Sequence, residues 1–194
     1  MHRLFVAIRP PEPVRDLLID AMDDSPDFRW QDEEQLHLTL RFVGEVDRPL
    51  ARDLADALSR IHAQPFEARI HGVGQFEQRN SGALWAAVEP KPPLSALASK
   101  IERSCQSVGL EPERRAFHPH ITLARWKGRR TREVHDFLQR KHALASEPFA
   151  IDRFALFESH LSRHGAHYEE VATYDLGCDQ ERSPADRAAG LRSA

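Results

Sequence analysis

Hydrophobic and polar positions fall into two periodicities over the first 176 residues of the chain. Short apolar runs and alternating patterns predict strands at residues 4–8, 36–43, 66–76, 83–88, 118–123, 149–158 and 167–176. Apolar residues at helical spacing predict helices at residues 10–24, 47–61, 93–108 and 131–141. Strands and helices are mixed and several strand pairs have short connections, which predicts an α+β fold with helices on one face of each sheet.

The composition sets the domain organisation that we expect. The chain has 194 residues, of which 41% are hydrophobic and 29% charged, enough for a sizeable core. No apolar run approaches the roughly 18 residues of a membrane-spanning helix, and the N-terminal stretch lacks the pattern of a signal peptide. Two cysteines, Cys105 and Cys178, form neither a disulfide framework nor a zinc site and indicate the reducing cytoplasm. After residue 176 the only large apolar residue is Leu191, so we expect one domain over residues 1–176 and a disordered tail over residues 177–194.

One short motif occurs twice, each time in a predicted strand. His37-Leu38-Thr39-Leu40 recurs as His120-Ile121-Thr122-Leu123, about half the domain further along the chain. With 11 histidines and four threonines present, only about 0.2 His-x-Thr triplets are expected by chance. Because strand side chains alternate between faces, each copy presents its histidine and threonine on one face and two apolar residues on the other. The repeat predicts an internal duplication whose two lobes meet across a central cleft.

Two histidines and two threonines that face one another suit acid–base chemistry on a bound anion. Since the ordinary pKa of imidazole is about 6.5, one histidine can be a neutral general base while the other is a protonated general acid. The threonine hydroxyls can donate to oxyanions, which makes a roughly symmetric clamp for a tetrahedral anion. A phosphodiester fits this clamp, because its in-line displacement needs a base on one side and an acid on the other. Binding of sulfate or a carboxylate would not need two proton-transfer groups.

Positive charge gathers beside the second motif, although the chain has a formal net charge of −3. Residues 111–132 contain seven basic and two acidic side chains, a patch that suits a phosphate-bearing ligand. Arg125 follows the second motif closely enough to reach a bound phosphate. Arg41 is a weaker phosphate candidate, because uninterrupted strand alternation gives it the histidine face of the first motif, toward the cleft rim.

These residues resemble the motifs of a known family. Residues 37–46 (HLTLRFVGEV) and 117–125 (FHPHITLAR) are similar to the twin motifs of the two-histidine (2H) phosphoesterase superfamily. Within it, the chain looks most like the RNA 2′,3′-cyclic phosphodiesterases, also known as the 2′-5′ RNA ligase (LigT-like) family. Residues 3–8 (RLFVAI) share the likeness, and the resemblance covers residues 1–176.

The resemblance implies a bilobal α+β fold, with two antiparallel sheets and outer helices flanking a central cleft. It also implies a hydrolase that needs no metal and no cofactor and opens the 2′,3′-cyclic phosphate of an RNA 3′ end to a 2′-phosphomonoester. By resemblance, His37 is the proton donor to the leaving 3′ oxygen, and His120 is the acceptor that activates water. Thr39 and Thr122 would hold the non-bridging phosphate oxygens, and Arg125 would add positive charge.

The expected partners follow from the same resemblance. They are RNA 3′ ends or nucleotides with a 2′,3′-cyclic phosphate, and some members run the reverse reaction, which joins tRNA halves through a 2′-5′ bond. We expect no membrane association and a monomer as the acting unit.

Three alternatives remain open from the sequence alone. A related enzyme could act on another cyclic or 2′-5′ nucleotide, such as ADP-ribose cyclic phosphate or 2′-5′ oligoadenylates. A non-catalytic module could use the twin motifs only to grip a nucleotide or RNA phosphate. A metalloenzyme could use His118 and His120, but no Asp, Glu or Cys stands at a matching ligand position.

Overall fold

The fold is built on one curved antiparallel sheet. The structure, a computed structural model, describes residues 1–23, 25–162 and 165–177; all but the first residue of the predicted tail lies outside them. Within these residues, nine strands form the sheet in the order β7-β4-β5-β6-β3-β1-β8-β9, with β2 paired to β6. The strands are β1 His2–Ile8, β2 Arg29–Trp30, β3 Leu38–Val46, β4 Phe66–Gln78, β5 Ser81–Glu89, β6 His120–Lys127, β7 Phe149–Ile151, β8 Arg153–Ser162 and β9 Gly165–Asp175.

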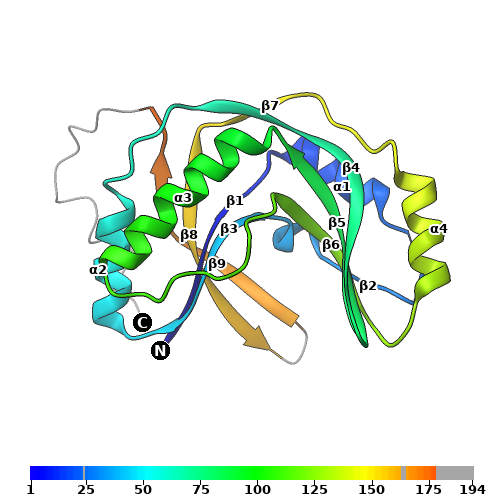
Figure 1. Cartoon of the computed structure of the whole chain (residues 1–194), viewed down its shortest axis with the longest axis horizontal. Helices are drawn as coiled ribbons and strands as arrows, with labels where there is room; N and C mark the ends of the chain where they lie inside the picture. The colour runs from blue at the N-terminus through cyan, green and yellow to red at the C-terminus, as the bar shows by residue number, and fades with distance from the viewer. Residues whose placement is uncertain (24, 163–164, 178–194) are drawn as a thin grey trace.

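The sheet consists of two antiparallel halves that meet at one seam. One half contains β7, β4, β5 and β6, and the other contains β3, β1, β8 and β9. The seam is the pairing of β3 with β6, which is registered at the single pair Leu38 and Ile121. The two expected sheets are therefore the two halves of one continuous sheet, and the strands with the repeated motif lie at its centre (Figure 1).

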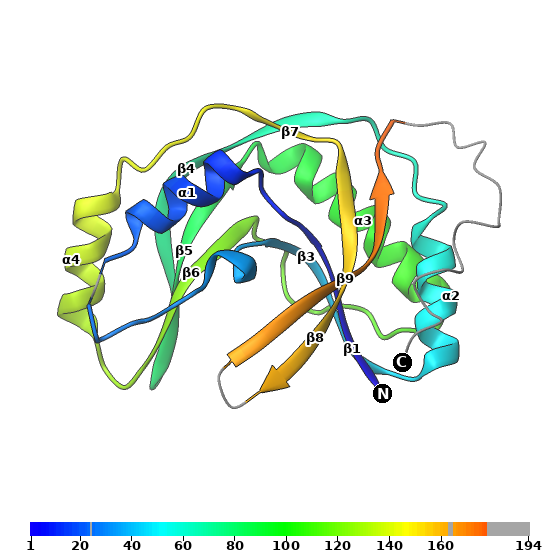
Figure 2. The same ribbon diagram turned by 180° about the vertical axis from the view of Figure 1, so that it is seen from behind.

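The helices share one hydrophobic core with the inward side chains of both halves. They are α1 Glu12–Ala21, α2 Arg48–Leu58, α3 Lys91–Ser107 and α4 Thr131–Lys141, and a short 3-10 helix, η1, spans Glu33–Gln35. Each of the four α-helices buries apolar residues in this core. In both views, α2 and α3 lie on the side of β1 and β3, and α1 and α4 lie on the side of β4, β5 and β6 (Figures 1 and 2). No helix among the described residues is both long and apolar enough to cross a membrane.

Local sequence signals explain most helix boundaries. The Asp47 side chain accepts a hydrogen bond from the Leu50 backbone N–H at 3.0 Å and caps α2, as predicted. Prolines occupy the first turn of α1, α2 and α3, where the missing N–H costs nothing. Gly109 has a φ of 90° just after α3, a conformation that glycine adopts freely at a helix end.

Three details of the fold differ from the sequence prediction. The strand predicted over residues 149–158 is broken at Asp152 into β7 and β8, which pair with opposite halves of the sheet. The β4–β5 hairpin has only Arg79 and Asn80 between its strands, so both strands are longer than predicted. The two-residue strand β2 and the helix η1 were not predicted, because such short elements carry no periodicity.

Candidate active site

The two His-x-Thr motifs lie side by side at the seam. Leu38 is paired with Ile121 in antiparallel register, so the register continued by one residue places His37 opposite Thr122 and Thr39 opposite His120. The polar side chains are half-buried on one face of the sheet, and the intervening apolar residues are buried in the core on the other, as the alternation predicted. A nearly two-fold arrangement results, with each histidine close to the threonine of the other motif.

Both imidazoles are held in the same way by the backbone. Nδ1 of His37 lies 2.7 Å from the carbonyl oxygen of Gln35, and Nδ1 of His120 lies 2.6 Å from that of His118. A carbonyl can only accept, so Nδ1 carries the proton in each ring and donates it. In a neutral imidazole, Nε2 is then a free acceptor. The site therefore holds two matched imidazoles with Nε2 available for a ligand.

The surroundings favour the neutral form of both histidines. Burial lowers the pKa of His37 to about 4, against the opposing effect of the Gln35 carbonyl. Burial also lowers the pKa of His120, and the positive charge of Arg125 acts in the same direction on both rings. In the free protein near pH 7, the site is thus two neutral bases beside a cation, an arrangement that an anion would complete.

Aromatic rings contact both histidines. The motif itself did not predict this feature. The ring of His37 lies 4.9 Å from Phe5 and 5.2 Å from Tyr168, centroid to centroid. Tyr168 comes from β9, and Figure 2 shows the β8–β9 hairpin extending from beside β1. The ring of His120 lies 4.8 Å from Phe76 and 6.0 Å from Trp85. These rings pack against each imidazole.

The position of the Trp85 ring depends on a glycine. A Cβ atom at Gly74 would come within 2.3 Å of the Trp85 indole, so the indole lies flat across the backbone of β4. Trp85 pairs with Thr122 on the neighbouring strand, which puts the indole on the motif face. A signal was present in the sequence: in a strand whose Leu84 and Ala86 point into the core, Trp85 must face the cleft.

A β-bulge brings Arg125 to the motif face. On β6, Thr122 pairs with Trp85 and Ala124 pairs with Leu84, so Leu123 is an extra residue. Leu123 and Ala124 are both buried, and the alternation resumes with Arg125 exposed on the side of Thr122. The structure thus brings together five of the six predicted site residues: His37, Thr39, His120, Thr122 and Arg125.

Arg41, the sixth predicted residue, points to the other face of the sheet. On β3, Thr39 pairs with Ala7 and Arg41 pairs with Val6, so Leu40 is the extra residue of a matching bulge. Val6 belongs to the core on the helix side, and Arg41 shares its face. The expectation that Arg41 lies beside the first motif is therefore wrong, because the bulge reverses the alternation that supported it.

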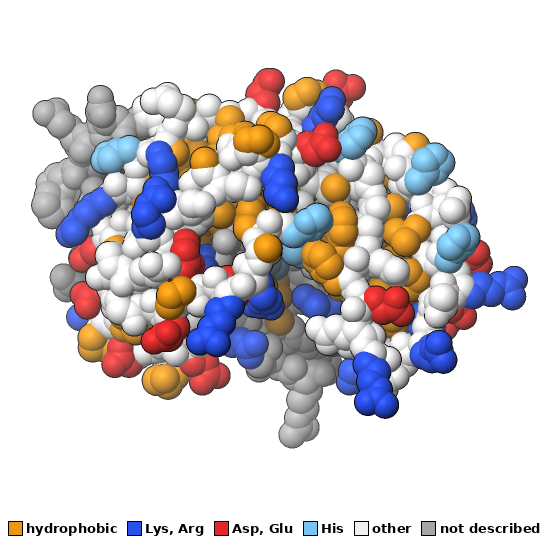
Figure 3. All heavy atoms as spheres, in the orientation of Figure 1, with side chains coloured by type: hydrophobic (Ala, Val, Ile, Leu, Met, Phe, Trp, Pro, Cys, Tyr) orange, Lys and Arg blue, Asp and Glu red, His pale blue; other side chains and the backbone are white. Residues whose placement is uncertain are grey.

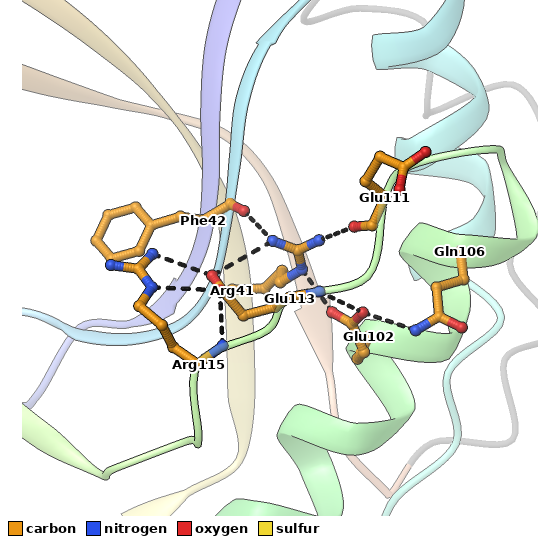
Figure 4. A network of polar contacts seen from close by, with 7 residues as sticks. All are labelled: Arg41, Phe42, Glu102, Gln106, Glu111, Glu113 and Arg115. Atoms are coloured by element: carbon orange, nitrogen blue, oxygen red, sulfur yellow. Dashed lines mark hydrogen bonds and ion pairs between the residues drawn. The ribbon is translucent and has the colours of Figure 1, made fainter.

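Arg41 instead joins β3 to α3 and to the loop before the second motif (Figure 4). Its side chain is only 9% exposed and forms an ion pair with Glu102 of α3. Nη1 lies 3.7 Å from a Glu113 carboxylate oxygen, and the guanidinium also donates to the Glu111 carbonyl. Arg115 and Arg41 together lower the pKa of Glu113 to about 2. The network holds residues 111–115 against β3.

The remaining candidate ligand groups do not gather. Among the described residues, no three His, Cys, Asp or Glu side chains are grouped closely enough to hold a metal ion. Cys105 is buried in α3, and burial raises the pKa of its thiol to about 11. Cys178 lies outside the described residues.

A sheet of two similar halves, each with a His-x-Thr strand at a common seam, is the architecture of the two-histidine phosphoesterases. The family model described as the 2′-5′ RNA ligase superfamily matches residues 10–163. The chain therefore belongs to the 2′-5′ RNA ligase superfamily.

Relatives with assigned names cover the chain to different extents. An RNA 2′,3′-cyclic phosphodiesterase from Thermus thermophilus is 32% identical over an alignment of 204 positions, gaps included. The alignment covers 97% of this chain and 99% of that protein. One from Geobacillus stearothermophilus is 30% identical over 161 residues, which cover 81% of this chain. The chain spans 50% of the length of the Geobacillus protein and 57% of that of an Aeropyrum pernix relative.

Solved structures show the same fold. E. coli LigT complexed with 3′-AMP superposes with a TM-score of 0.75 at 26% identity, covering 91% of this chain and 99% of LigT. TT0787 of Thermus thermophilus superposes with a TM-score of 0.73 at 27% identity, covering 92% of this chain and all of that protein. The bilobal fold expected from the sequence is thereby confirmed.

The electrostatics of the site predict a response to phosphate. In an NMR titration of the free protein, we expect His37 to remain neutral down to about pH 5, because its pKa is about 4. Saturating inorganic phosphate should raise the pKa of His37 and His120, since a nearby anion favours the protonated imidazole. The variants His37→Gln and His120→Gln assign the resonances. Titration of His37 near pH 6.5 in the free protein, or no change with phosphate, would contradict this description.

The opposite orientations of Arg41 and Arg125 predict opposite effects of their removal. Arg41→Ala leaves Glu102 without its cation and should lower the free energy of unfolding by about 2 kcal/mol, measured by urea denaturation. Its Kd for phosphate should stay within about twofold of the original. Arg125→Ala should leave the unfolding free energy within about 0.5 kcal/mol but weaken phosphate binding about tenfold or more. If Arg41→Ala weakened phosphate binding and Arg125→Ala lowered the stability instead, Arg41 would belong to the binding site.

Proposed function

We propose that the chain hydrolyses the 2′,3′-cyclic phosphate at RNA 3′ ends and leaves a 2′-phosphomonoester. The observation that carries the proposal is the pair of imidazoles, each anchored through Nδ1 on strands that the Leu38–Ile121 pair holds together. A reaction that needs one proton acceptor and one proton donor uses both imidazoles, whereas phosphate binding alone does not. Relatives named RNA 2′,3′-cyclic phosphodiesterase support the choice of substrate.

In the proposed reaction, His120 is the base and His37 is the acid. Nε2 of His120 takes a proton from water as the water oxygen forms a bond to phosphorus. The bond between phosphorus and the 3′ oxygen breaks, and Nε2 of protonated His37 gives that oxygen its proton. The product is a 2′-phosphate beside a free 3′ hydroxyl, and exchange with solvent restores both histidines.

The bound substrate supplies the charge that this assignment needs. The buried site keeps both histidines neutral in the free protein, although the acid must enter the reaction protonated. A cyclic phosphodiester is an anion, so its binding raises the pKa of the imidazoles beside it and allows His37 to take up a proton. Thr39 and Thr122 donate to the non-bridging oxygens, and Arg125 balances the charge that builds up on them.

The wider proposal includes the partners and the location of the reaction. The substrates are RNA 3′ ends or nucleotides that carry a 2′,3′-cyclic phosphate, and no cofactor is required. The reverse reaction, 2′-5′ joining of RNA ends such as tRNA halves, uses the same two proton transfers in the opposite order. We place the activity in the cytoplasm, because the two cysteines indicate a reducing compartment. We also propose that a single chain acts, because one chain carries both motifs.

The direct test is product analysis without metal. Purified protein is incubated with nucleoside 2′,3′-cyclic phosphates in excess EDTA, and chromatography resolves the 2′- from the 3′-phosphate. We expect turnover to the 2′-phosphate in EDTA, since side chains supply both proton transfers. Turnover that disappears in EDTA and returns with one divalent ion would make the chain a metalloenzyme. Binding without turnover would make it a phosphate-binding module.

Removal of each histidine tests its role. His37→Ala and His120→Ala should each lower kcat by about 10²- to 10⁴-fold, the usual contribution of one proton-transfer group. The double variant should lose far less than the product of the two effects, because the residues act as a unit. A substrate whose 3′ oxygen is replaced by a good leaving group needs no acid, so it should largely rescue His37→Ala only. Rescue of His120→Ala instead would reverse the assignment.

A further inference from the structure

The basic residues near the second motif separate into paired and unpaired groups. Arg115 pairs with Glu113 at 3.0 Å, and in the same segment Arg130 and Arg132 also have aspartate partners. Two exposed residues of β6, Arg125 and Lys127, form no ion pair with any described residue. The positive charge on β6 is therefore available to an external ligand.

The strand β2 adds a third unpaired cation to this face. Arg29 pairs directly with Arg125, and Trp30 pairs with Ala124. Trp30 and Ala124 belong to the core side, so Arg29 and Arg125 share the opposite, motif-bearing face. Arg29 is exposed and, within the described part of the chain, has no acidic partner.

This arrangement is unfavourable in the free protein. Like charges directly opposite each other on neighbouring strands destabilise a sheet. The two-residue strand is nevertheless fixed in register, because the Gln31 N–H donates to the Leu123 carbonyl at 2.8 Å and Trp30 packs against Phe137 at 5.6 Å. The core thus holds Arg29 beside Arg125 against their repulsion, which indicates an anionic ligand.

The row of side chains that contains these arginines has an aromatic ring at its other end. Phe76, Ala83, Arg125 and Arg29 are successive cross-strand partners on β4, β5, β6 and β2. Phe76 is 39% exposed, and the side chain of Ala83, between Phe76 and Arg125, is small and does not project far from the sheet. Exposed aromatic rings beside unpaired cations are typical of surfaces that bind single-stranded nucleic acid.

We propose that Arg29 and Lys127 form a second phosphate subsite, which binds the phosphodiester preceding the terminal nucleotide of a single-stranded RNA. Arg125 lies between this subsite and the histidines and serves the terminal cyclic phosphate. Lys127 lies two residues further along β6, about 7 Å away, and Arg29 lies about 5 Å to the side. These separations are comparable with those between neighbouring phosphates of one strand.

The proposal rests on the proposed function and adds a substrate class to it: RNA chains are preferred to mononucleotides. Figure 3 shows that Lys and Arg side chains gather along the rim near the far ends of β4, β5 and β6. A chain leaving the subsite in this direction would meet several positive side chains. A free cyclic nucleotide, with one phosphate, would leave Arg29 and Lys127 unused.

The test compares substrates of different length. Adenosine 2′,3′-cyclic phosphate and the adenosine dinucleotide with the same cyclic end are hydrolysed by the original protein, Arg29→Ala and Arg29→Lys. Arg132→Ala, which also removes one arginine charge but from the exposed surface of α4, is the control. We expect the original protein to prefer the dinucleotide by about tenfold or more in kcat/KM. Arg29→Ala should lose most of this preference, with the mononucleotide within about twofold.

Two further measurements separate a binding role from a structural one. The salt dependence of dinucleotide KM should weaken in Arg29→Ala by about 0.7 in the log–log slope, the value for one lost phosphate contact on a single strand. The free protein should not become less stable, because the substitution relieves the repulsion with Arg125. Arg29→Lys should retain most of the preference, since the charge is kept.

The outcomes distinguish the two proposals. If the original protein hydrolyses neither substrate, the proposed function fails before the subsite is tested. If it hydrolyses both substrates equally well, the subsite is wrong and the proposed function stands. Equal losses on both substrates in Arg29→Ala would assign Arg29 to the terminal phosphate. Equal effects of Arg29→Ala and Arg132→Ala on the dinucleotide would reduce the preference to general charge, and either result would overturn the proposal.

Discussion

The seam between β3 and β6 is the constraint on which the site depends. A single registered pair, Leu38 with Ile121, joins the two halves of the sheet. Because the pairing is antiparallel, a motif repeated on both strands is placed head to tail about this pair, and each histidine comes opposite the other threonine. A slip of one residue would turn one motif into the core, and the buried apolar residues on the helix side oppose such a slip. The helix-side core thus fixes the spacing of the two histidines, which lie on the opposite face of the sheet.

Matching bulges decide which charged residues reach the site. Each motif strand has an extra residue just after its threonine, Leu40 on β3 and Leu123 on β6. In both strands the next side chain on the motif-bearing face is therefore the fifth residue after the histidine. This residue is Phe42 in one copy and Arg125 in the other. The two halves have the same backbone design but different chemistry at this position. The arginine is present on one side only, so the two matched histidines have different electrostatic surroundings.

The sequence predicted the motif faces but not the bulges. Alternation holds from His37 to Thr39 and from His120 to Thr122, so four site residues could be placed by parity alone. Arg41 could not, because a bulge is a property of strand pairing and leaves no periodic signal. An alignment of the two motif copies places Arg41 with Ala124 and Phe42 with Arg125, and that comparison would have shown the error. The aromatic walls and β2 depend on which strands meet, information that no single segment contains.

The electrostatics of the site explain why a buried pair of imidazoles is a suitable device for an anionic substrate. Burial and the charge of Arg125 both disfavour protonation, so the free site does not hold a protonated pair whose charges repel each other. Each Nε2 is kept as an acceptor by the backbone carbonyl on the other nitrogen. A phosphate bound beside the two rings brings a negative charge that stabilises an imidazolium. A neutral ligand of the same shape would leave both imidazoles as bases, so selectivity for an anion is built into the protonation state as well as into the contacts.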